Sequence, residues 1–256
     1  MTLPFDCSGR TALITGASSG IGRRFAAILA AAGASVVIGA RRTELLADLE
    51  AEILKAGGRV KAAAMDVADE ASIIAAFDLA TETFGPVDTV IANAGMNAPG
   101  SALGLPAEDF DRMTSVNFRG VFLTAREGAR RMVAAGSVES GRGRVVLISS
   151  VTGSWVPSGS AGYAATKAAV NQMGRALAKD WAGKGVNVNV IAPGYMVTEI
   201  NDEMWDLPMG KKLLADFPRH RVMSVSALDP ILLYLASDAS AEVTGSIFTI
   251  DDGQTL

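Results

Sequence analysis

A glycine-rich stretch, Thr15-Gly16-Ala17-Ser18-Ser19-Gly20-Ile21-Gly22, joins a short apolar run at residues 11–15 to an alanine-rich stretch of helical length at residues 21–32. Glycine in such a connection allows a sharp reversal, close approach of the backbone to a pyrophosphate, and tight packing of helix on strand. The helix N-terminus that follows offers free N–H groups and a partial positive charge to phosphates. A tight turn without a ligand could carry the same glycines. No Gly-Lys-Ser/Thr follows, so a P-loop is excluded.

Outward from this turn, strand-like and helix-like segments alternate along the chain. We predict strands at 11–15, 35–39, 60–65, 87–92, 144–149, 186–191 and 246–250, and helices at 21–32, 43–56, 70–84, 107–135 and 161–182. Valine and isoleucine on both faces of the strands are typical of a parallel sheet covered by helices. The sequence therefore predicts one α/β domain over residues 1–256, a Rossmann-like doubly wound parallel sheet of about seven strands. A Met-, Trp- and Pro-rich segment at 195–218 follows the sixth strand and is expected to be a substrate lid.

Composition excludes several classes of function. The net charge of −4 and the pI near 5.1 argue against a nucleic-acid surface. Cys7 is the only cysteine and His220 the only histidine, so we expect no disulfide and no metal site. The apolar residues 25–40 are too few for a membrane span and contain Gly33, and the first ten residues lack the pattern of a secretory signal. We therefore expect a cytoplasmic protein without membrane partners.

Two arginines bear on the choice of cofactor. NAD-binding folds of this kind usually place an acid about 20 residues beyond the glycines, where it binds the ribose 2′-OH. Here the second strand ends in Gly39-Ala40-Arg41-Arg42, with no carboxylate and two guanidinium groups that suit a 2′-phosphate. This favours NADP. If both arginines are merely solvated residues at a helix start, NAD remains possible.

Tyr163 and Lys167 carry the candidate chemistry. Their i, i+4 spacing places them on one face of a predicted helix. A free tyrosine has a pKa of about 10, and a nearby ammonium group lowers it, so the pair could act as a general acid or base. Ser150 ends the fifth predicted strand, where its hydroxyl could hydrogen-bond a substrate carbonyl or simply cap a turn.

Together these motifs resemble those of the short-chain dehydrogenase/reductase family. The resemblance rests on Thr15–Gly22 (TGASSGIG), Asn93-Ala94-Gly95, Asn117, Ser150, the Tyr163/Lys167 pair and Pro193-Gly194, which occur in the family's order and spacing from about residue 10 to residue 253. It implies hydride transfer between a nicotinamide and a carbonyl or alcohol carbon.

The resemblance also implies roles for individual residues. Asn117, Ser150, Tyr163 and Lys167 would form a catalytic tetrad, with Asn117 holding a water between Lys167 and solvent. The cofactor would be held by Gly16, Ser18, Ser19, Gly20, Ile21, Gly22, Arg41, Arg42, Asp66, Val67, Asn93, Ala94, Gly95, Tyr163, Lys167, Pro193, Gly194 and Thr198. Asp66 could equally cap a helix. The substrate pocket would be lined by Ser150, Trp155, Tyr163, Tyr195, Met196, Met204 and Trp205, although these aromatic and methionine side chains could also be plain packing residues.

Two positions depart from the family's pattern. NADP-using members often carry a basic residue where this chain has Ser19, and the family's usual Asp-Gly-Gly near the end is Asp251-Asp252-Gly253 here. The second change puts the local turn and any oligomer contact in doubt. His220 lies outside the tetrad and is expected at the surface or in an interface.

Two alternative functions stay open. One is an NAD-linked sugar or polyol dehydrogenase of the same family, and the other is a nucleotide-binding sensor that keeps the fold without catalysis. Residues 195–210 contain no Arg or Lys, which favours a substrate less charged than a sugar phosphate. The resemblance implies a homotetramer or homodimer, and Ala165, Ala168, Ala169 and Ala176 could pack against a partner subunit.

Overall fold

The computed structural model describes residues 5–98, 100–197 and 203–256. Its described strands form one parallel sheet in the order β3-β2-β1-β4-β5-β6-β7. The strands are β1 (Thr11–Thr15), β2 (Ser35–Ala40), β3 (Arg59–Ala64), β4 (Thr89–Ala92), β5 (Gly143–Ile148), β6 (Val186–Pro193) and β7 (Ile247–Ile250). The order reverses between β1 and β4, which is the switch point where folds of this kind bind ligands.

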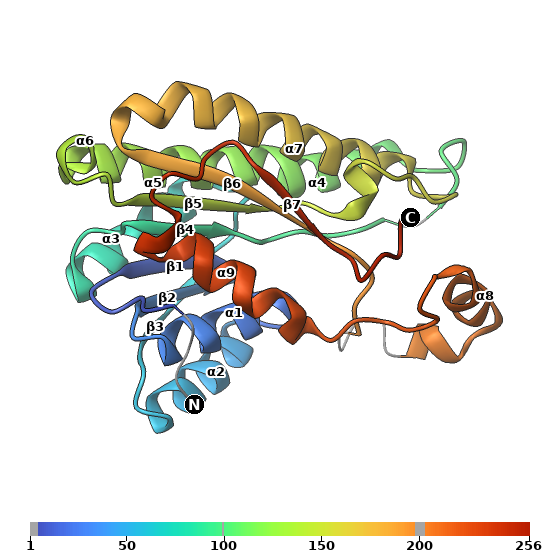
Figure 1. Ribbon diagram of the computed structural model, residues 1–256, viewed down its shortest axis with the longest axis horizontal. Helices are drawn as coiled ribbons and strands as arrows, with labels where there is room; N and C mark the ends of the chain where they lie inside the picture. Colours follow the sequence, from blue (N-terminus) through green and yellow to red (C-terminus); the bar gives the residue numbers. More distant parts are fainter. Residues whose placement is uncertain (1–4, 99, 198–202) are drawn as a thin grey trace.

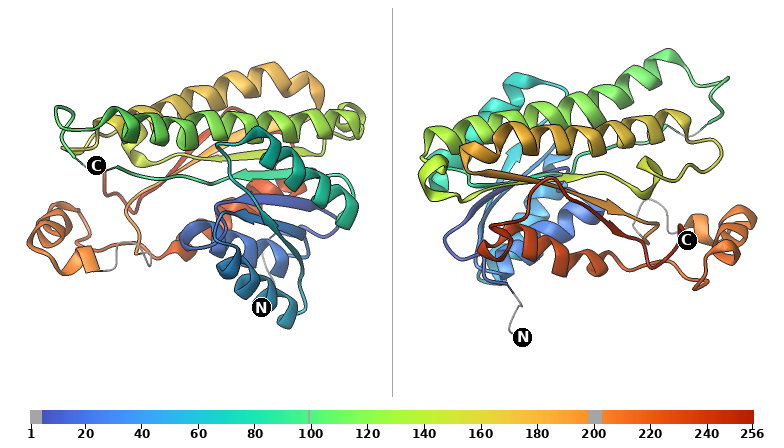
Figure 2. Two further views of the ribbon diagram at one scale, coloured as in Figure 1. Left: turned by 180° about the vertical axis from the view of Figure 1, so that it is seen from behind. Right: turned by 45° about the horizontal axis from the view of Figure 1, so that its top comes forward.

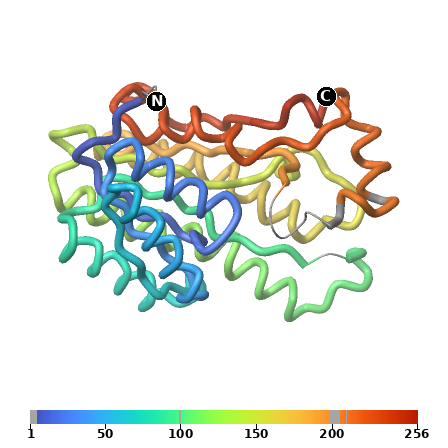
Figure 3. The backbone as a smooth tube through the Cα atoms, turned by 90° about the horizontal axis from the view of Figure 1, so that it is seen from below, coloured from blue at the N-terminus to red at the C-terminus, as the bar shows by residue number. Residues whose placement is uncertain are grey.

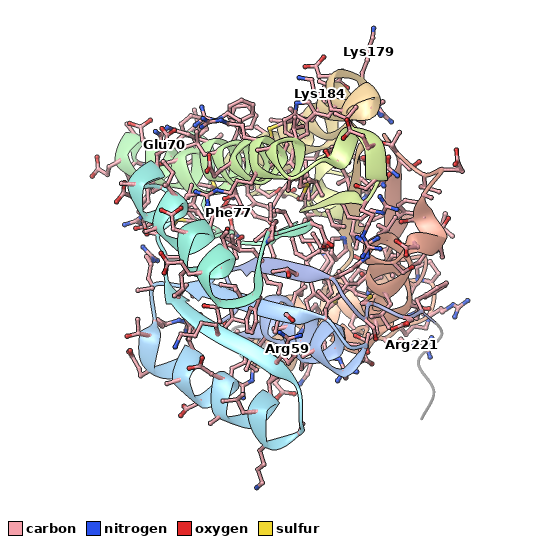
Figure 4. The ribbon with its side chains drawn as sticks, turned by 90° about the vertical axis from the view of Figure 1, so that its left-hand side faces the viewer. Arg59, Glu70, Phe77, Lys179, Lys184 and Arg221 are labelled. Carbon is pink, nitrogen blue, oxygen red and sulfur yellow. The ribbon has the colours of Figure 1, made fainter. Side chains whose placement is uncertain are left out.

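Helices cover both faces of the sheet, as Figure 1 shows. The helices are α1 (Gly20–Ala31), α2 (Thr43–Lys55), α3 (Glu70–Phe84), α4 (Ala107–Thr114), α5 (Val121–Ala134), α6 (Ser137–Ser140), α7 (Ala161–Trp181), α8 (Pro208–Asp216) and α9 (Asp229–Ala236). Helices α1, α2 and α9 bury their apolar sides in one core, and α3, α5 and α7 bury theirs in the other. Phe77 points from α3 into the second core and is fully buried, whereas Lys179 of α7 points into solvent (Figure 4).

The doubly wound sheet is therefore confirmed, and the predicted strands differ from the observed ones only at their ends. The larger differences are in the helices, since the sequence pattern does not predict α8 and α9. Residues 107–135, expected as one helical stretch, are broken by a π-helix, Ser115–Gly120, between α4 and α5. A π-turn is rare and inserts where a side chain or neighbouring backbone makes better contacts than the regular helix allows. Here it carries Asn117, whose side chain bonds to a loop outside the helix, and Gly120, which packs directly on Val67. The spacing of apolar residues in the sequence does not predict this π-helix, because one extra residue in a helical turn hardly changes that spacing.

One end of the molecule collects the segments that follow β4, β5, β6 and β7 (Figure 3). Helix α8 lies at this end and stands apart from the sheet and its covering helices in every ribbon view (Figures 1 and 2). It packs on a short 3-10 turn, Glu203–Asp206. None of the described helices is both long and apolar enough to cross a bilayer.

Candidate active site

The glycine-rich turn between β1 and α1 requires its glycines. Gly16 and Gly20 have φ of 68° and 54°, in the left-handed region that side chains disfavour. A Cβ on Gly22 would collide with the carbonyl oxygen of Gly16 and lie 2.5 Å from Nδ2 of Asn93. The first turn of α1 contains no acidic residue, so its free N–H groups face no carboxylate. These features fit a turn that receives phosphate.

Thr15 and Asn93 join the first turn to the loop after β4. The hydroxyl oxygen of Thr15 accepts hydrogen bonds from the backbone N–H groups of Asn93 and Ala94, both at 3.0 Å. Nδ2 of Asn93 donates back to the carbonyl oxygen of Thr15 at 2.9 Å. These hydrogen bonds hold the ends of the neighbouring strands β1 and β4 together at the switch point.

Arg42 lies over the glycine-rich turn. Its Nη2 donates to the hydroxyl oxygens of Ser18 at 2.9 Å and Ser19 at 2.6 Å, and its Nε is 3.2 Å from that of Ser18. Arg41 is exposed and makes no side-chain hydrogen bond that the structure records within its described part. Ser19, which stands where a basic residue is common in NADP-using members of the family, thus accepts a hydrogen bond from the guanidinium group of Arg42, which lies between β2 and α2.

A cleft of about 650 Å³ runs along the ends of the strands. It contains fifteen of the residues expected to hold a cofactor: Gly16, Ser18, Ser19, Gly20, Ile21, Gly22, Arg41, Arg42, Asp66, Val67, Asn93, Ala94, Gly95, Tyr163 and Lys167. It is also lined by residues that the sequence reasoning did not assign to the site: Ala40, Met65, Met96, Asn97, Val116, Ile148 and Ser149. Most of these residues are next in sequence to an expected site residue at a strand end, and that position could have identified them.

Asp66 does not cap α3. Its Oδ1 accepts from the N–H of Ala68 at 3.0 Å, which fixes the loop after β3. The cap of α3 is Asp69, whose side chain accepts from Ala71. Asp66 therefore keeps its place in the cleft wall.

Tyr163, Ser150 and Lys167 meet where β5 ends and α7 begins. The Ser150 hydroxyl accepts a hydrogen bond from the N–H of Thr152 at 3.2 Å and acts to lower the pKa of the Tyr163 phenol, against the larger effect of burial. Both roles considered for Ser150, in the chemistry and in capping a turn, are thus compatible. The Lys167 ammonium is buried, donates to the carbonyl oxygen of Ile148 at 3.0 Å, and lies 5.6 Å from the centre of the Tyr163 ring.

Burial dominates the titration of this group. It raises the pKa of Tyr163 to about 12, opposed by the hydrogen bond with Ser150, with a smaller raising effect from Tyr195. It also lowers the pKa of Lys167 to about 8. The sequence predicts a lowered pKa for Tyr163, and the protein's own groups do not produce it, because loss of solvation outweighs them. A phenol in this setting is a proton donor at neutral pH.

Asn117 is fully buried in the π-helix and its amide is fully engaged. Oδ1 accepts from the N–H of Met96 at 2.8 Å, while Nδ2 donates to the carbonyl oxygen of Met96 at 2.8 Å and to the hydroxyl of Thr166 at 3.2 Å. The side chain thus fixes the loop after β4, and a water would have to bind through another atom of Asn117. A Cβ on Gly95 would lie 3.5 Å from both Asn117 Oδ1 and Lys167 Nζ, which places the three residues together.

The segment after β6 follows a tightly packed Gly194. A Cβ there would collide with the side chain of Gln254 and the backbone of Asp251. Pro193 is the last residue of β6, and neither it nor Gly194 lines the cleft. Thr198, also expected to hold cofactor, lies outside the described residues.

The expected substrate-pocket aromatics form a cluster around Tyr195. Its ring lies 6.0 Å from that of Trp205, edge to face, and 5.7 Å from that of Phe217. Phe217 is buried and was missed, because nothing local distinguishes it from a core residue. Met196 is also buried, and Trp155 is half-buried. Met204 lies in the 3-10 turn Glu203–Asp206 and its side chain is not described. None of these residues, nor Ser150, lines the cleft itself.

Comparison with known proteins places the chain in a family. The family model for short chain dehydrogenases matches residues 10–207. D-threitol dehydrogenase from Mycolicibacterium smegmatis is 33% identical over 252 residues, covering 98% of this chain and 95% of the relative, and gluconate 5-dehydrogenase from Gluconobacter oxydans is 34% identical over 253 residues, covering 98% and 97%. The crystal structure of a gluconate 5-dehydrogenase from Burkholderia cenocepacia in complex with NADP and tartrate superposes with a TM-score of 0.91 at 35% identity, over 98% of this chain and 97% of that one. The chain therefore belongs to the short-chain dehydrogenase/reductase family, as an NAD(P)-dependent oxidoreductase of the alcohol dehydrogenase and ketoreductase type.

Proposed function

We propose that this enzyme uses NADP to interconvert a ketone or aldehyde and an alcohol, with Tyr163 as the general acid or base. The observation that carries the proposal is the joint placement of two groups along one cleft. Arg42, bound to Ser18 and Ser19, lies at the end of β2, while Tyr163 and Lys167 lie beside the end of β5. Strands β2 and β5 are three strand spacings apart, about 14 Å. An elongated ligand with a phosphate at one end suits this arrangement.

The residues of the cleft fit a dinucleotide. Burial lowers the pKa of Lys167 because it disfavours the charged ammonium group. A polar ligand beside this group would reduce the free-energy cost of burying its charge. Arg42 would bind the 2′-phosphate together with Ser18 and Ser19, and the N-terminus of α1 would receive the pyrophosphate. Lys167 would hold the hydroxyls of the nicotinamide ribose. NADP is bound in several similar solved structures, which supports the choice of this cofactor.

The chemistry of the protein's own groups follows from their protonation. NADPH, when bound, supplies the hydride that reduces the carbonyl carbon. Ser150 orients the carbonyl oxygen through its hydroxyl. Tyr163, neutral at pH 7 because burial raises its pKa, donates its phenolic proton to the oxygen as negative charge develops there. In alcohol oxidation Tyr163 would act as the phenolate, which the positive charges of Lys167 and of a bound oxidised cofactor would stabilise, and its oxygen would accept the hydroxyl proton and return to the neutral phenol.

A second candidate is an NAD-linked sugar or polyol dehydrogenase, and the names of the relatives favour its substrate class. Their names include D-threitol, gluconate 5- and galactitol 2-dehydrogenases. Cofactor and substrate can be separated in one experiment. Initial rates are measured with NADP and NAD against polyols, sugar acids and cyclic secondary alcohols, and in reverse with NADPH and NADH against ketones. The proposal predicts a higher kcat/KM with NADP than with NAD for every accepted substrate, and the opposite order would overturn the cofactor assignment.

Three further expectations stay predictions. A homotetramer or homodimer is supported by the exposure of Ala165, Ala168 and Ala176 on α7, and light scattering tests it. A cytoplasmic location is supported by the single cysteine, Cys7, which is buried and free, and cell fractionation tests it. Ordering of residues 195–218 over bound substrate is tested by hydrogen exchange.

A further inference from the structure

The loop that carries the substrate-pocket aromatics is closed at its base by its own backbone. The N–H of Val197 donates to the carbonyl oxygen of Met223 at 3.1 Å, and the N–H of Met223 donates to the carbonyl oxygen of Tyr195 at 3.3 Å. A single β-bridge pairs Met196 with Met223. These contacts hold the two ends of the loop together. Tyr195 is therefore the residue at which the outgoing and returning chains meet.

The turn that follows β7 holds Tyr195 from the other side. The Gln254 amide accepts from the N–H of Tyr195 at 2.7 Å and donates to its carbonyl oxygen at 3.0 Å, so this buried side chain pairs with the backbone as a neighbouring strand would. Asp251 fixes the turn by accepting from Gly253 at 3.0 Å and from the N–H and hydroxyl of Thr255 at 3.1 and 2.6 Å.

Asp252 connects the same turn to the returning chain. Its carboxylate binds Arg221 through Nε at 2.6 Å and Nη2 at 3.1 Å, and it binds Nη1 of Arg219 at 2.9 Å. The carboxylate is 15% exposed although both arginines are more than 60% exposed, so its position is fixed mainly by these partners. Arg221 is two residues before Met223, whose N–H bonds to Tyr195.

The backbone at Asp252 indicates why an acid stands there. Its φ is 54°, a conformation that glycine adopts freely and that costs other residues free energy. Such a conformation persists where surrounding contacts offset its cost in free energy, and residues of this kind are common at functional sites. The two arginines supply that compensation here. His220, between them, also has a positive φ, 48°, and is exposed, in agreement with its expected place at the surface.

Tyr195 is the point at which this arrangement reaches the expected substrate pocket. Its ring packs on Trp205 and Phe217, so the position of its backbone decides where this aromatic cluster lies. A displacement of the Tyr195 backbone would move this wall of the pocket. A wall that contacts the substrate equally in the ground state and the transition state contributes to KM and leaves kcat unchanged.

We propose that Asp252, with Arg219 and Arg221, is a positioning residue that clamps the base of the substrate loop and so fixes Tyr195 and its aromatic cluster as a wall of the substrate pocket. The role rests on the proposed function, because it assumes that substrate binds beside Tyr195.

Asp252→Asn tests the clamp, because asparagine tolerates a positive φ and only the charge is removed. We expect KM for the carbonyl or alcohol substrate to rise about three- to fivefold, as for loss of a surface ion-pair network, while kcat and the KM for NADPH stay within about twofold. The amides of Tyr195 and Met223 should exchange faster, with or without a known substrate. Arg219→Gln combined with Arg221→Gln should have the same effect, and adding Asp252→Asn should then change nothing further.

Asp78→Asn is the matched control, since it removes a carboxylate from an exposed pair with Arg131, 2.8 Å apart, on α3 and α5. If Asp252→Asn proves poorly folded, Asp252→Gly serves instead, because glycine fits the φ of 54° without strain. The proposal is overturned if Asp252→Asn matches the wild type and Asp78→Asn in substrate KM and in the exchange of both amides. Failure of the proposed function would show differently, as no Tyr163-dependent turnover in the wild type, and would leave the exchange comparison intact.

Discussion

The ammonium nitrogen of Lys167 lies 5.6 Å from the centre of the Tyr163 ring and donates its hydrogen bond to the carbonyl oxygen of Ile148. A cation is therefore buried next to the proposed proton donor. Within the described part of the chain no carboxylate forms an ion pair with it. Burying this charge lowers the stability of the fold, and such a loss of stability is common where residues serve activity.

Lys167→Met should stabilise the protein at pH 7. The pKa of Lys167 is about 8 in the folded protein against 10.5 normally, a difference worth about 3 kcal/mol. Loss of the bond to Ile148 offsets about 1 kcal/mol of this, so we expect a gain on the order of 1–2 kcal/mol.

The pH dependence of that gain has a definite sign. Between pH 8 and 10.5 the unfolded chain binds more protons at this lysine than the folded one, so wild-type stability rises with pH and the advantage of the variant shrinks. Urea unfolding at pH 7 and pH 10 measures both. Lys179→Met, an exposed position on the same helix α7, should show neither effect (Figure 4). A variant no more stable than the wild type at pH 7 would show that Lys167 is not destabilising.

Arg42→Ala should weaken NADP binding about ten- to a hundredfold, the worth of a charge-assisted hydrogen bond to phosphate. Arg41→Ala is the neighbouring control and should weaken NADP binding less, because only Arg42 is held by Ser18 and Ser19. NAD affinity should change little in both. Isothermal titration calorimetry measures the affinity of each variant for NADP and NAD. Equal losses of NADP affinity in the two variants would contradict the special role of Arg42.

Asn117→Ala should destabilise the fold by about 2–4 kcal/mol, because it removes three hydrogen bonds made by a fully buried amide. Asn97→Ala, at an exposed position in the same loop, should lie within about 0.5 kcal/mol of the wild type. Urea midpoints compare the two variants. Equal stability would mean that the Asn117 amide does not support the loop after β4.

The sequence allowed the fold and the central part of the candidate site to be predicted because their signals are local. The glycines at 16, 20 and 22 are required by φ or by close packing within one turn, and Tyr163 and Lys167 are one helical turn apart. Alternating apolar segments then define the parallel sheet, and a parallel sheet brings strand ends to one edge.

What could not be predicted depends on contacts between distant residues. Gln254 pairs with the backbone of Tyr195, 59 positions away, and no motif marks such a side chain. The proposed preference for Arg42 over Arg41 depends on the hydrogen bonds that only Arg42 makes to the hydroxyls of Ser18 and Ser19. The pKa of Tyr163 is raised by burial, which depends on the whole fold.

Tyr163→Phe tests the central claim most directly. The substitution keeps the ring but removes the proton that Tyr163 donates, and Ser150 and Lys167 remain in place. With NADPH and a carbonyl substrate found in the screen, we predict that kcat falls by at least about a hundredfold, while NADPH affinity measured by fluorescence titration stays within about threefold. A variant that keeps more than about a tenth of the wild-type kcat would contradict the assignment of Tyr163 as general acid.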